Sequence, residues 1–207
     1  MSKKPSVTGR LVIFRHGQTP YNKAHLMTGI ADVPLTALGE AQAADAGRAI
    51  AHLRFDKVFA STLSRAFNTA ALALEAAGTQ EHLRHDDGSF MISKSKDIVE
   101  LDTGDFTGRC HKTDPEILNW GRTYDVPLPN GESSKQVVER VGRFFDKKVL
   151  PRLERGETVL VVVHAGIVRA FDIVLGIEPV PADGQEMPKR PVPNASPALF
   201  EFTDGVL

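Results

Sequence analysis

Short apolar runs alternate with longer helical patterns along the chain, which predicts an α/β fold. Leu11 to Phe14, Lys57 to Ala60 and Thr158 to Val163 are predicted as buried strands, and Thr158 to Val163 is the clearest of them. Because these runs are continuous rather than alternating, both faces of each strand should be covered. Weaker strand patterns occupy Phe90 to Ile92, Ile98 to Leu101 and Ala198 to Phe202.

Helical patterns fill the intervals between these runs. Thr36 to Arg54 is alanine-rich, and a stripe of Leu38, Ala41, Ile50 and Leu53 predicts its buried face, with Thr36 as the N-cap. Further helices are expected from Ser61 to near Gly78, from Val137 to Val149 with Pro151 as the stop, and from Ile167 to Leu175.

The fold class that follows is a single α/β domain over residues 1–207, a three-layer sandwich with a mostly parallel sheet flanked by helices. The segment 179–197 holds six of the 13 prolines and is expected to be a long, stiff loop before the last strand. A loop of this length is usually functional or disordered, and both interpretations remain open.

Composition narrows the class of protein. The 207 residues are 42% hydrophobic and carry a formal net charge of -1, which is typical of a globular domain and argues against a nucleic-acid binder. The longest apolar run, Val159 to Val163, is far too short to span a membrane. The polar N-terminus resembles no signal peptide, and the one cysteine, Cys110, excludes an intrachain disulfide. We therefore expect a cytoplasmic protein.

Polar clusters follow three of the predicted strands. Arg15 and His16 follow the first strand, Ser61 to Arg65 the second, and His164 the third. If the strands are parallel neighbours, these side chains meet at one edge of the sheet. Each alone could be a surface arginine or a core histidine. Together they predict a site for an anion, and arginine forks suit phosphate oxygens.

Histidine chemistry is the mechanism that this cluster favours. His16 could serve as a general base, or attack phosphorus through one ring nitrogen while a backbone carbonyl holds the other. The leaving alkoxide then needs a proton from a carboxylic acid. Glu100, Asp102 and Asp105 are the candidates, and their spacing does not choose between them.

Four motifs in order resemble the histidine phosphatase superfamily over almost the whole chain. They are Arg15-His16-Gly17-Gln18-Thr19-x-x-Asn22, Ser61-x-x-x-Arg65-Ala66-x-x-Thr69-Ala70, Glu100-x-x-x-Gly104-x-x-x-Gly108 and His164-Ala165-Gly166. The resemblance implies that His16 is the phosphorylated nucleophile and Glu100 the proton donor and acceptor. It also implies that Arg15, Arg65 and His164 bind the transferring phosphoryl group, that Asn22, Thr28 and Gly29 contact phosphate or substrate, and that no metal takes part.

Two further segments resemble the cofactor-dependent phosphoglycerate mutase branch of this superfamily. They are Met27 to Thr36 and Arg122 to Pro129, the latter followed by Gly131-Glu132-Ser133. Several positions at which that branch has substrate-binding side chains are occupied by other residues in this chain. Thr103 occupies the position of its tyrosine, and His111, which is next to Lys112, occupies that of its lysine. Gly121-Arg122 replaces its arginine pair, and Ala165-Gly166 replaces its Gly-Asn.

The function predicted by this resemblance is an isomerase, a phosphoglycerate mutase that interconverts 2- and 3-phosphoglycerate through a phosphohistidine at His16. 2,3-Bisphosphoglycerate would be the priming phosphate donor, and Arg122, His111 and Lys112 would hold the substrate. The alternative is a phosphatase that hydrolyses a small phosphate monoester, since a weaker substrate clamp favours loss of the intermediate. A third hypothesis is a phosphate-binding protein without catalysis. The expected partner is a small phosphorylated substrate, without nucleic acid or membrane; mutases of this branch often form homo-oligomers.

Overall fold

Five strands form one mixed sheet at the centre of the computed structural model, which describes residues 6–120, 123–188, 190–203 and 206–207. The strands are β1 (Thr8–Arg15), β2 (Lys57–Ser61), β3 (Ile92–Ser95), β4 (Thr158–Val163) and β5 (Ala198–Thr203). Their order across the sheet is β3-β2-β4-β1-β5, with only β5 antiparallel to its neighbour. The predicted, mostly parallel α/β sheet is confirmed.

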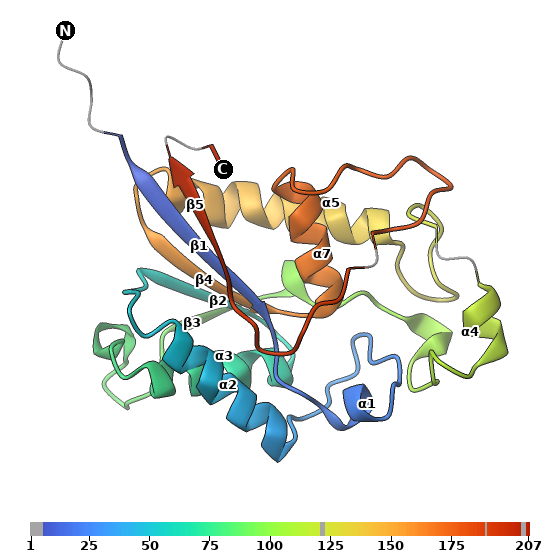
Figure 1. The fold of residues 1–207 in the computed structure, drawn as a ribbon, viewed down its shortest axis with the longest axis horizontal. Helices are drawn as coiled ribbons and strands as arrows, with labels where there is room; N and C mark the ends of the chain where they lie inside the picture. The colour runs from blue at the N-terminus through green and yellow to red at the C-terminus, as the bar shows by residue number, and fades with distance from the viewer. Residues whose placement is uncertain (1–5, 121–122, 189, 204–205) are drawn as a thin grey trace, which may run out of the picture.

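Helices cover both faces of the sheet (Figure 1). α2 (Ala37–Ala49) and α3 (Ser64–Ala77) lie below it in this view, and α5 (Ser134–Phe144) and α7 (Ala165–Val174) above. The short helices are α1 (Pro20–Lys23), α4 (Pro115–Asn119) and α6 (Leu150–Leu153).

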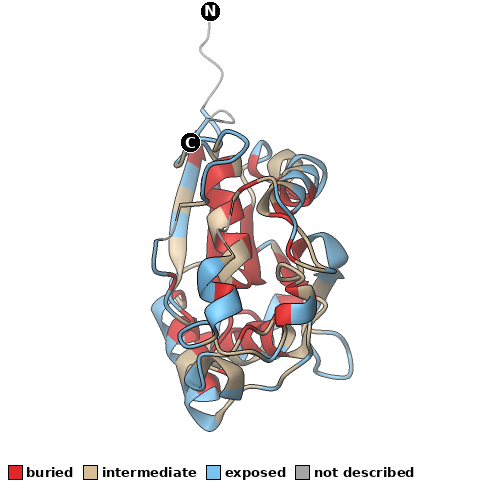
Figure 2. Cartoon of the chain, turned by 90° about the vertical axis from the view of Figure 1, so that its right-hand side faces the viewer, coloured by how far each residue is buried: buried red, intermediate tan, exposed pale blue. Residues whose placement is uncertain are grey.

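Alternate residues along the strands point into two hydrophobic cores, one on each face of the sheet. Leu11 and Ile13 pack in the core beneath α5 and α7, whereas Val12 and Phe14 pack in the core beside α2 and α3. Figure 2 shows the buried residues gathered between the outer, exposed faces of the helices. This two-sided burial explains why the strands appear as continuous apolar runs.

The buried face predicted for the helix over Thr36 to Arg54 is partly wrong. Ile50 is buried and Leu53 packs against the same core, as predicted, but Leu38 and Ala41 are exposed. Leu38 is 53% exposed, and the buried positions within α2 are Gly39, Ala43, Ala46 and Gly47. The reason is close helix–helix approach: a Cβ at Gly47 would overlap the backbone carbonyl of Ala73 in α3. Small residues therefore mark this interface, and a large side chain such as that of Leu38 points to solvent.

The strand predicted at Ile98 to Leu101 is also wrong. Lys96–Ile98 forms a 3-10 turn instead. The Arg140 side chain takes the place of a neighbouring strand, because its Nη1 donates to the carbonyl of Asp97 at 2.7 Å and its Nη2 to that of Glu100 at 3.1 Å. The neighbouring pattern at Phe90 to Ile92 is shifted, since β3 begins only at Ile92.

Pro151 does not end the helix predicted over Val137 to Val149. The chain continues through a π-helical segment, Phe145–Val149, into α6, where Pro151 occupies the first turn. A proline is tolerated there because the wider π turn and the start of a new helical segment leave its missing N–H without consequence.

The described residues between α7 and β5 contain neither helix nor strand, although Glu186 forms an isolated bridge with Thr123. Within the described part of the chain, none of the helices has the length and apolar character needed to cross a membrane.

Candidate active site

The three polar clusters meet at the carboxyl edge of the sheet, as predicted. β4 lies between β1 and β2 and is parallel to both, with Arg15 paired to Val163 at the end of the register. His16 therefore follows β1 beside His164, which follows β4. The two imidazole rings have centroids 5.2 Å apart. Arg65 reaches the same place from the first turn of α3, directly after β2.

The ring of His16 is oriented by a backbone carbonyl. Its Nδ1 lies 2.6 Å from the carbonyl oxygen of Gly17. A carbonyl only accepts hydrogen bonds, so Nδ1 must carry the proton and Nε2 must be unprotonated. Nε2 accepts a hydrogen bond from Arg65 Nε at 3.2 Å. The free electron pair of His16 is thus directed to the arginine that would bind an anion.

Arg65 is held by two backbone carbonyls although its side chain is fully buried. Its Nη1 donates to Ala31 at 2.6 Å and its Nη2 to Gly29 at 2.8 Å. Gly29 has a φ of 50°, and a Cβ there would overlap the hydroxyl of Thr103. A glycine is therefore needed at this position to bring the carbonyl to the guanidinium.

Several buried nitrogens of the cluster have no hydrogen-bond partner among the described residues. They are Nε of Arg15 and both ring nitrogens of His164. Arg15 is otherwise fixed by its Nη1, which donates to the carbonyl of Val192 at 2.9 Å. Buried polar atoms without partners are costly and uncommon. A tetrahedral anion could accept from Nε of Arg15 and from the one ring nitrogen of His164 that carries a proton.

Burial controls the charge of the two histidines. The pKa of His16 is held well below its usual range by burial first, and then by the positive charges of Arg65 and Arg15. Burial and Arg65 likewise hold the pKa of His164 well below the usual range. Both rings are therefore neutral at pH 7. Burial also lowers the pKa of Arg15 and of Arg65, and no carboxylate lies within ion-pair distance of either in the described part of the chain.

Glu100 faces the same space. It lines a cavity of about 360 Å3, here named the histidine cavity, together with predicted residues Arg15, His16, Asn22, Thr28, Gly29, Arg65 and His111. The Oε1 atom of Glu100 accepts from the N–H of Leu101 at 2.9 Å, and Oε2 from that of Gly166 at 3.3 Å. The approach depends on Gly166, because a Cβ there would lie 2.5 Å from Oε1.

The two other acid candidates are engaged elsewhere. Asp102 caps a turn by accepting from the N–H of Gly104 at 2.9 Å, and Asp105 is exposed and accepts from Asn130 Nδ2 at 3.0 Å. Neither lines the histidine cavity. The geometry therefore separates Glu100 from the two carboxylates that sequence spacing left equivalent.

The predicted substrate clamp is only partly brought together. His111 lines the rim of the histidine cavity and is exposed. Lys112 is exposed, does not line the cavity, and has its Nζ 3.0 Å from Nε2 of His25, which does line it. Arg122 lies outside the described residues.

Sequence reasoning missed several polar residues of the site, among them His25, Arg169 and Asn194. Asn194 lines the histidine cavity, and its Nδ2 donates to the carbonyl of His16 at 2.8 Å and to Oδ1 of Asn22 at 3.3 Å. It comes from the proline-rich segment, which carries no local signal for such a contact. Arg169 also lines the cavity. It lies one helical turn after Ala165 in α7, so helical spacing could have indicated it.

No group of three or more histidine, cysteine, aspartate or glutamate side chains among the described residues is arranged to hold a metal ion.

Comparison with known families identifies the chain. The model of the histidine phosphatase superfamily (branch 1) matches residues 11–206. The chain belongs to the histidine phosphatase superfamily. The match includes all three strand ends that form the histidine cavity.

Relatives of this histidine phosphatase carry two kinds of name. A 2,3-bisphosphoglycerate-dependent phosphoglycerate mutase of Parvibaculum lavamentivorans is 34% identical, covering 94% of this chain and 90% of the relative. The structure of a Bacillus anthracis phosphoglycerate mutase superposes with a TM-score of 0.76 at 25% identity, covering 97% and 91%. A mycobacterial glucosyl-3-phosphoglycerate phosphatase in complex with VO3 superposes with a TM-score of 0.70 at 26% identity, covering 92% of each chain.

Proposed function

We propose that this histidine phosphatase is a phosphomonoesterase that hydrolyses a small phosphate ester through a phosphohistidine at His16. The observation that carries the proposal is the unprotonated Nε2 of His16, directed by the Gly17 carbonyl toward Arg65 among buried nitrogens without partners. Such an arrangement binds a phosphoryl group and presents a nucleophile to it at the same time.

In the first half of the reaction, Nε2 of His16 attacks phosphorus. The bond between phosphorus and the ester oxygen breaks, and the carboxylic acid of Glu100 gives its proton to the leaving alkoxide. Arg15, Arg65 and His164 bind the transferring oxygens, and Asn194 keeps the His16 backbone in place through its 2.8 Å hydrogen bond. The products are an alcohol and phosphohistidine.

In the second half, water replaces the alcohol. The carboxylate of Glu100 takes a proton from the water as its oxygen attacks phosphorus, and the bond between phosphorus and Nε2 breaks. Orthophosphate leaves, and Glu100 is again protonated for the next cycle. Neutral His16 is restored because its lowered pKa disfavours a protonated ring.

Hydrolysis is favoured over the mutase reaction by the thin substrate clamp. Thr103, which takes the place of the tyrosine typical of the mutase branch, is buried and has its hydroxyl 2.7 Å from that of Thr107. Lys112 lies outside the cavity lining and beside His25. A mutase must keep its bisphosphate intermediate bound while that intermediate changes its orientation. This requires substrate-binding side chains such as the tyrosine and lysine of the mutase branch.

A phosphoglycerate mutase is the second candidate, and the name of the 34% identical Parvibaculum relative favours it. The histidine cavity fits one phosphoryl end of 2,3-bisphosphoglycerate through its lining residues Arg15 and Arg65. When bound, that compound would supply the phosphoryl group that primes His16. Its second phosphate would rely on Arg169, His111 and His25 at the rim.

A two-product assay tests the choice. The enzyme is given 3-phosphoglycerate with and without a trace of 2,3-bisphosphoglycerate, and also a panel of simple phosphate esters, while 2-phosphoglycerate and orthophosphate are followed together. We expect orthophosphate from some esters and no stimulated isomer. Isomer formation that needs the trace bisphosphate, with little orthophosphate, would identify a mutase and refute the hydrolase proposal.

Substitution of the nucleophile tests the part that both candidates share. His16→Ala should lower turnover at least about 10⁴-fold and abolish the acid-labile label from a 32P-labelled substrate. His85→Ala is the matched control, because His85 is exposed and distant from the cavity lining. Turnover by His16→Ala close to that of the unaltered enzyme would exclude the covalent mechanism.

A further inference from the structure

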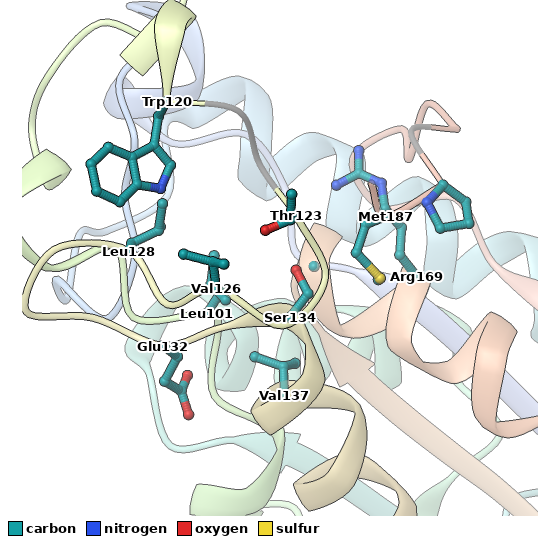
Figure 3. A pocket seen from close by; sticks show the side chains of 12 residues that line it. Leu101, Trp120, Thr123, Val126, Leu128, Glu132, Ser134, Val137, Arg169 and Met187 are labelled. Atoms are coloured by element: carbon teal, nitrogen blue, oxygen red, sulfur yellow. The ribbon is translucent and has the colours of Figure 1, made fainter. Parts of the chain in front are cut away.

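A second cavity of about 300 Å3 adjoins the histidine cavity and is here named the side cavity. The two share three lining residues, Leu101, Gly166 and Arg169, so they lie next to each other. Figure 3 shows Trp120 and Leu128 on one side of the side cavity, and Met187 with Arg169 on the other. The organic group of an ester whose phosphate is bound beside His16 would therefore lie near the side cavity.

The lining of the side cavity is predominantly apolar. It includes Leu101, Trp120, Val126, Leu128, Val137 and Met187. The hydroxyls of Thr123 and Ser134 provide a small polar face (Figure 3). Val126 remains 46% exposed. Apolar surface left in contact with water is unfavourable, and an apolar ligand that covers it is bound in proportion to the area removed from water.

Few charged side chains among the described residues line the side cavity. Its one described acidic lining residue, Glu132, is already neutralised: Oε1 accepts from Arg140 Nε at 3.0 Å, and Oε2 from Arg140 Nη2 at 2.9 Å. Its one described cationic lining residue, Arg169, lies at the junction with the histidine cavity. Among the described residues, no cation faces the far end, where Trp120 and Leu128 lie.

The walls of the side cavity are fixed before any ligand binds. The N–H of Tyr124 donates to the carbonyl of Gln185 at 2.6 Å, and the N–H of Lys135 donates to the carbonyl of Tyr124 at 2.8 Å. The carboxylate of Asp125 also accepts from the N–H of Gly184 at 2.8 Å. These bonds join the segment after α4, the start of α5 and the proline-rich segment, so a ligand need not order them.

We propose that the side cavity binds the organic group of the substrate, and that this group is an apolar alkyl or aromatic residue. The inference rests on the proposed phosphomonoesterase and names its substrate class. The phosphoryl group binds to Arg15, Arg65 and His164, and the apolar group lies against Leu101, Val126 and Met187.

The test is a series of n-alkyl phosphates and n-alkylphosphonates from two to six carbons, all compared on the unaltered enzyme. These alcohols differ little in acidity, so chain length changes binding and leaves the chemistry constant. We expect kcat/KM for the phosphates, and affinity for the phosphonates by calorimetry, to rise about fourfold for each buried methylene until the cavity is filled. No rise, or no binding of the phosphonates, overturns the inference.

Two variants locate the effect. Val126→Asp places a charge in the side cavity at a half-exposed position, and should reduce the hexyl-to-ethyl ratio of kcat/KM at least about tenfold. Val180→Asp is the matched control, because Val180 is 66% exposed and lies outside both cavity linings. It should keep the ratio of the unaltered enzyme. A ratio that survives in Val126→Asp, or falls equally in both variants, contradicts the inference.

Failure of this inference can be distinguished from failure of the proposed function. Phosphohistidine formed from every ester with no dependence on chain length would refute the apolar substrate alone. A dependence of phosphonate affinity on chain length, without any phosphohistidine, would support the side cavity and refute the phosphomonoesterase.

Discussion

The histidine cavity and the side cavity adjoin each other but are built from different parts of the fold. The first is formed mainly by the ends of β1 and β4, the start of α3 and the loops directly after them. The second is formed mainly by segments far from the strands, namely Trp120, residues 123–128, the start of α5 and the proline-rich segment. Strand ends are held by the whole core, so the reactive groups are placed rigidly.

The two cavities also differ in the kind of group that is left without a favourable contact. In the histidine cavity, the buried Nε of Arg15 has no partner among the described residues, and an anion could accept from it. In the side cavity, apolar side chains such as Val126 remain partly exposed. One region thus recognises the charge common to all phosphate esters, and the other selects the organic group. Reaction type and substrate choice can therefore change independently in such a site.

After loss of the nucleophile itself, removal of the proposed acid should have the largest effect on turnover, and the effect should be the same for every ester. Glu100→Gln keeps the shape of the side chain but cannot donate or accept the proton, so we expect kcat to fall about 10²- to 10⁴-fold. Affinity for orthophosphate should change far less. Equal losses of kcat for ethyl and hexyl phosphate would show that Glu100 acts in the chemical step and not in binding the organic group. Steady-state kinetics with orthophosphate as inhibitor provide both values.

Asp105→Asn is the control for this variant, since Asp105 is exposed and does not line the histidine cavity. Its rate should match that of the unaltered enzyme. If Asp105→Asn were impaired and Glu100→Gln were not, the acid would have to be assigned to another carboxylate.

A methyl group at the junction of the two cavities should have an intermediate effect. Gly166→Ala would place its Cβ 2.5 Å from Oε1 of Glu100 and displace the carboxylate. A misplacement of this size lowers kcat by about 10- to 100-fold. The hexyl-to-ethyl ratio should be unchanged if the loss lies only in the acid.

The matched control for this variant is Gly142→Ala, within α5. Its Cβ would meet nothing closer than Val174 Cγ2 at 3.9 Å. We expect normal kinetics and a gain in the free energy of unfolding of about 0.5–1 kcal/mol. Equal kinetic losses in the two alanine variants would show that Gly166 has no special place beside Glu100.

The smallest expected effect is a loss of stability in mild acid that is caused by the two histidines. His16 and His164 have pKa values held well below the usual range in the folded protein. Below about pH 6.5 the unfolded chain therefore binds protons that the folded chain does not. As the pH is lowered below this value, the free energy of unfolding should fall by up to about 1.4 kcal/mol per pH unit for each histidine. The fall should stop when the pH reaches the pKa of the histidine in the folded protein.

Urea unfolding between pH 5 and pH 7.5 measures this slope. His164→Gln should reduce it by about half, and saturating orthophosphate should also reduce it, because a bound anion raises the pKa of both rings. A slope that is the same in His164→Gln would mean that other groups produce it.

Most of the histidine cavity could be predicted from the sequence. Arg15, His16 and His164 follow continuous apolar runs, and the parallel arrangement of those strands brings their ends together. The carbonyl that orients His16 was expected as well, because a nucleophilic imidazole needs its second nitrogen held. It proved to be that of the adjacent Gly17.

Other parts could not be predicted, and in each case a distant contact was responsible. Ile98 to Leu101 has a strand-like pattern, but the Arg140 side chain binds its carbonyls from α5. The buried face of α2 is determined by how closely Gly47 approaches α3, which periodicity of large apolar residues cannot indicate. Asn194 reaches His16 across most of the chain length.

The sequence by itself determined the sheet, the strand-end cluster and the superfamily, because apolar periodicity and short motifs depend on neighbours only a few residues apart. Only the tertiary structure separated Glu100 from Asp102 and Asp105, since carboxylates close together in sequence differ in which side of a loop they face. It alone also revealed the side cavity, whose walls come from segments joined by hydrogen bonds such as that between Tyr124 and Gln185. A cavity is a property of distant surfaces brought together, and no local pattern encodes it.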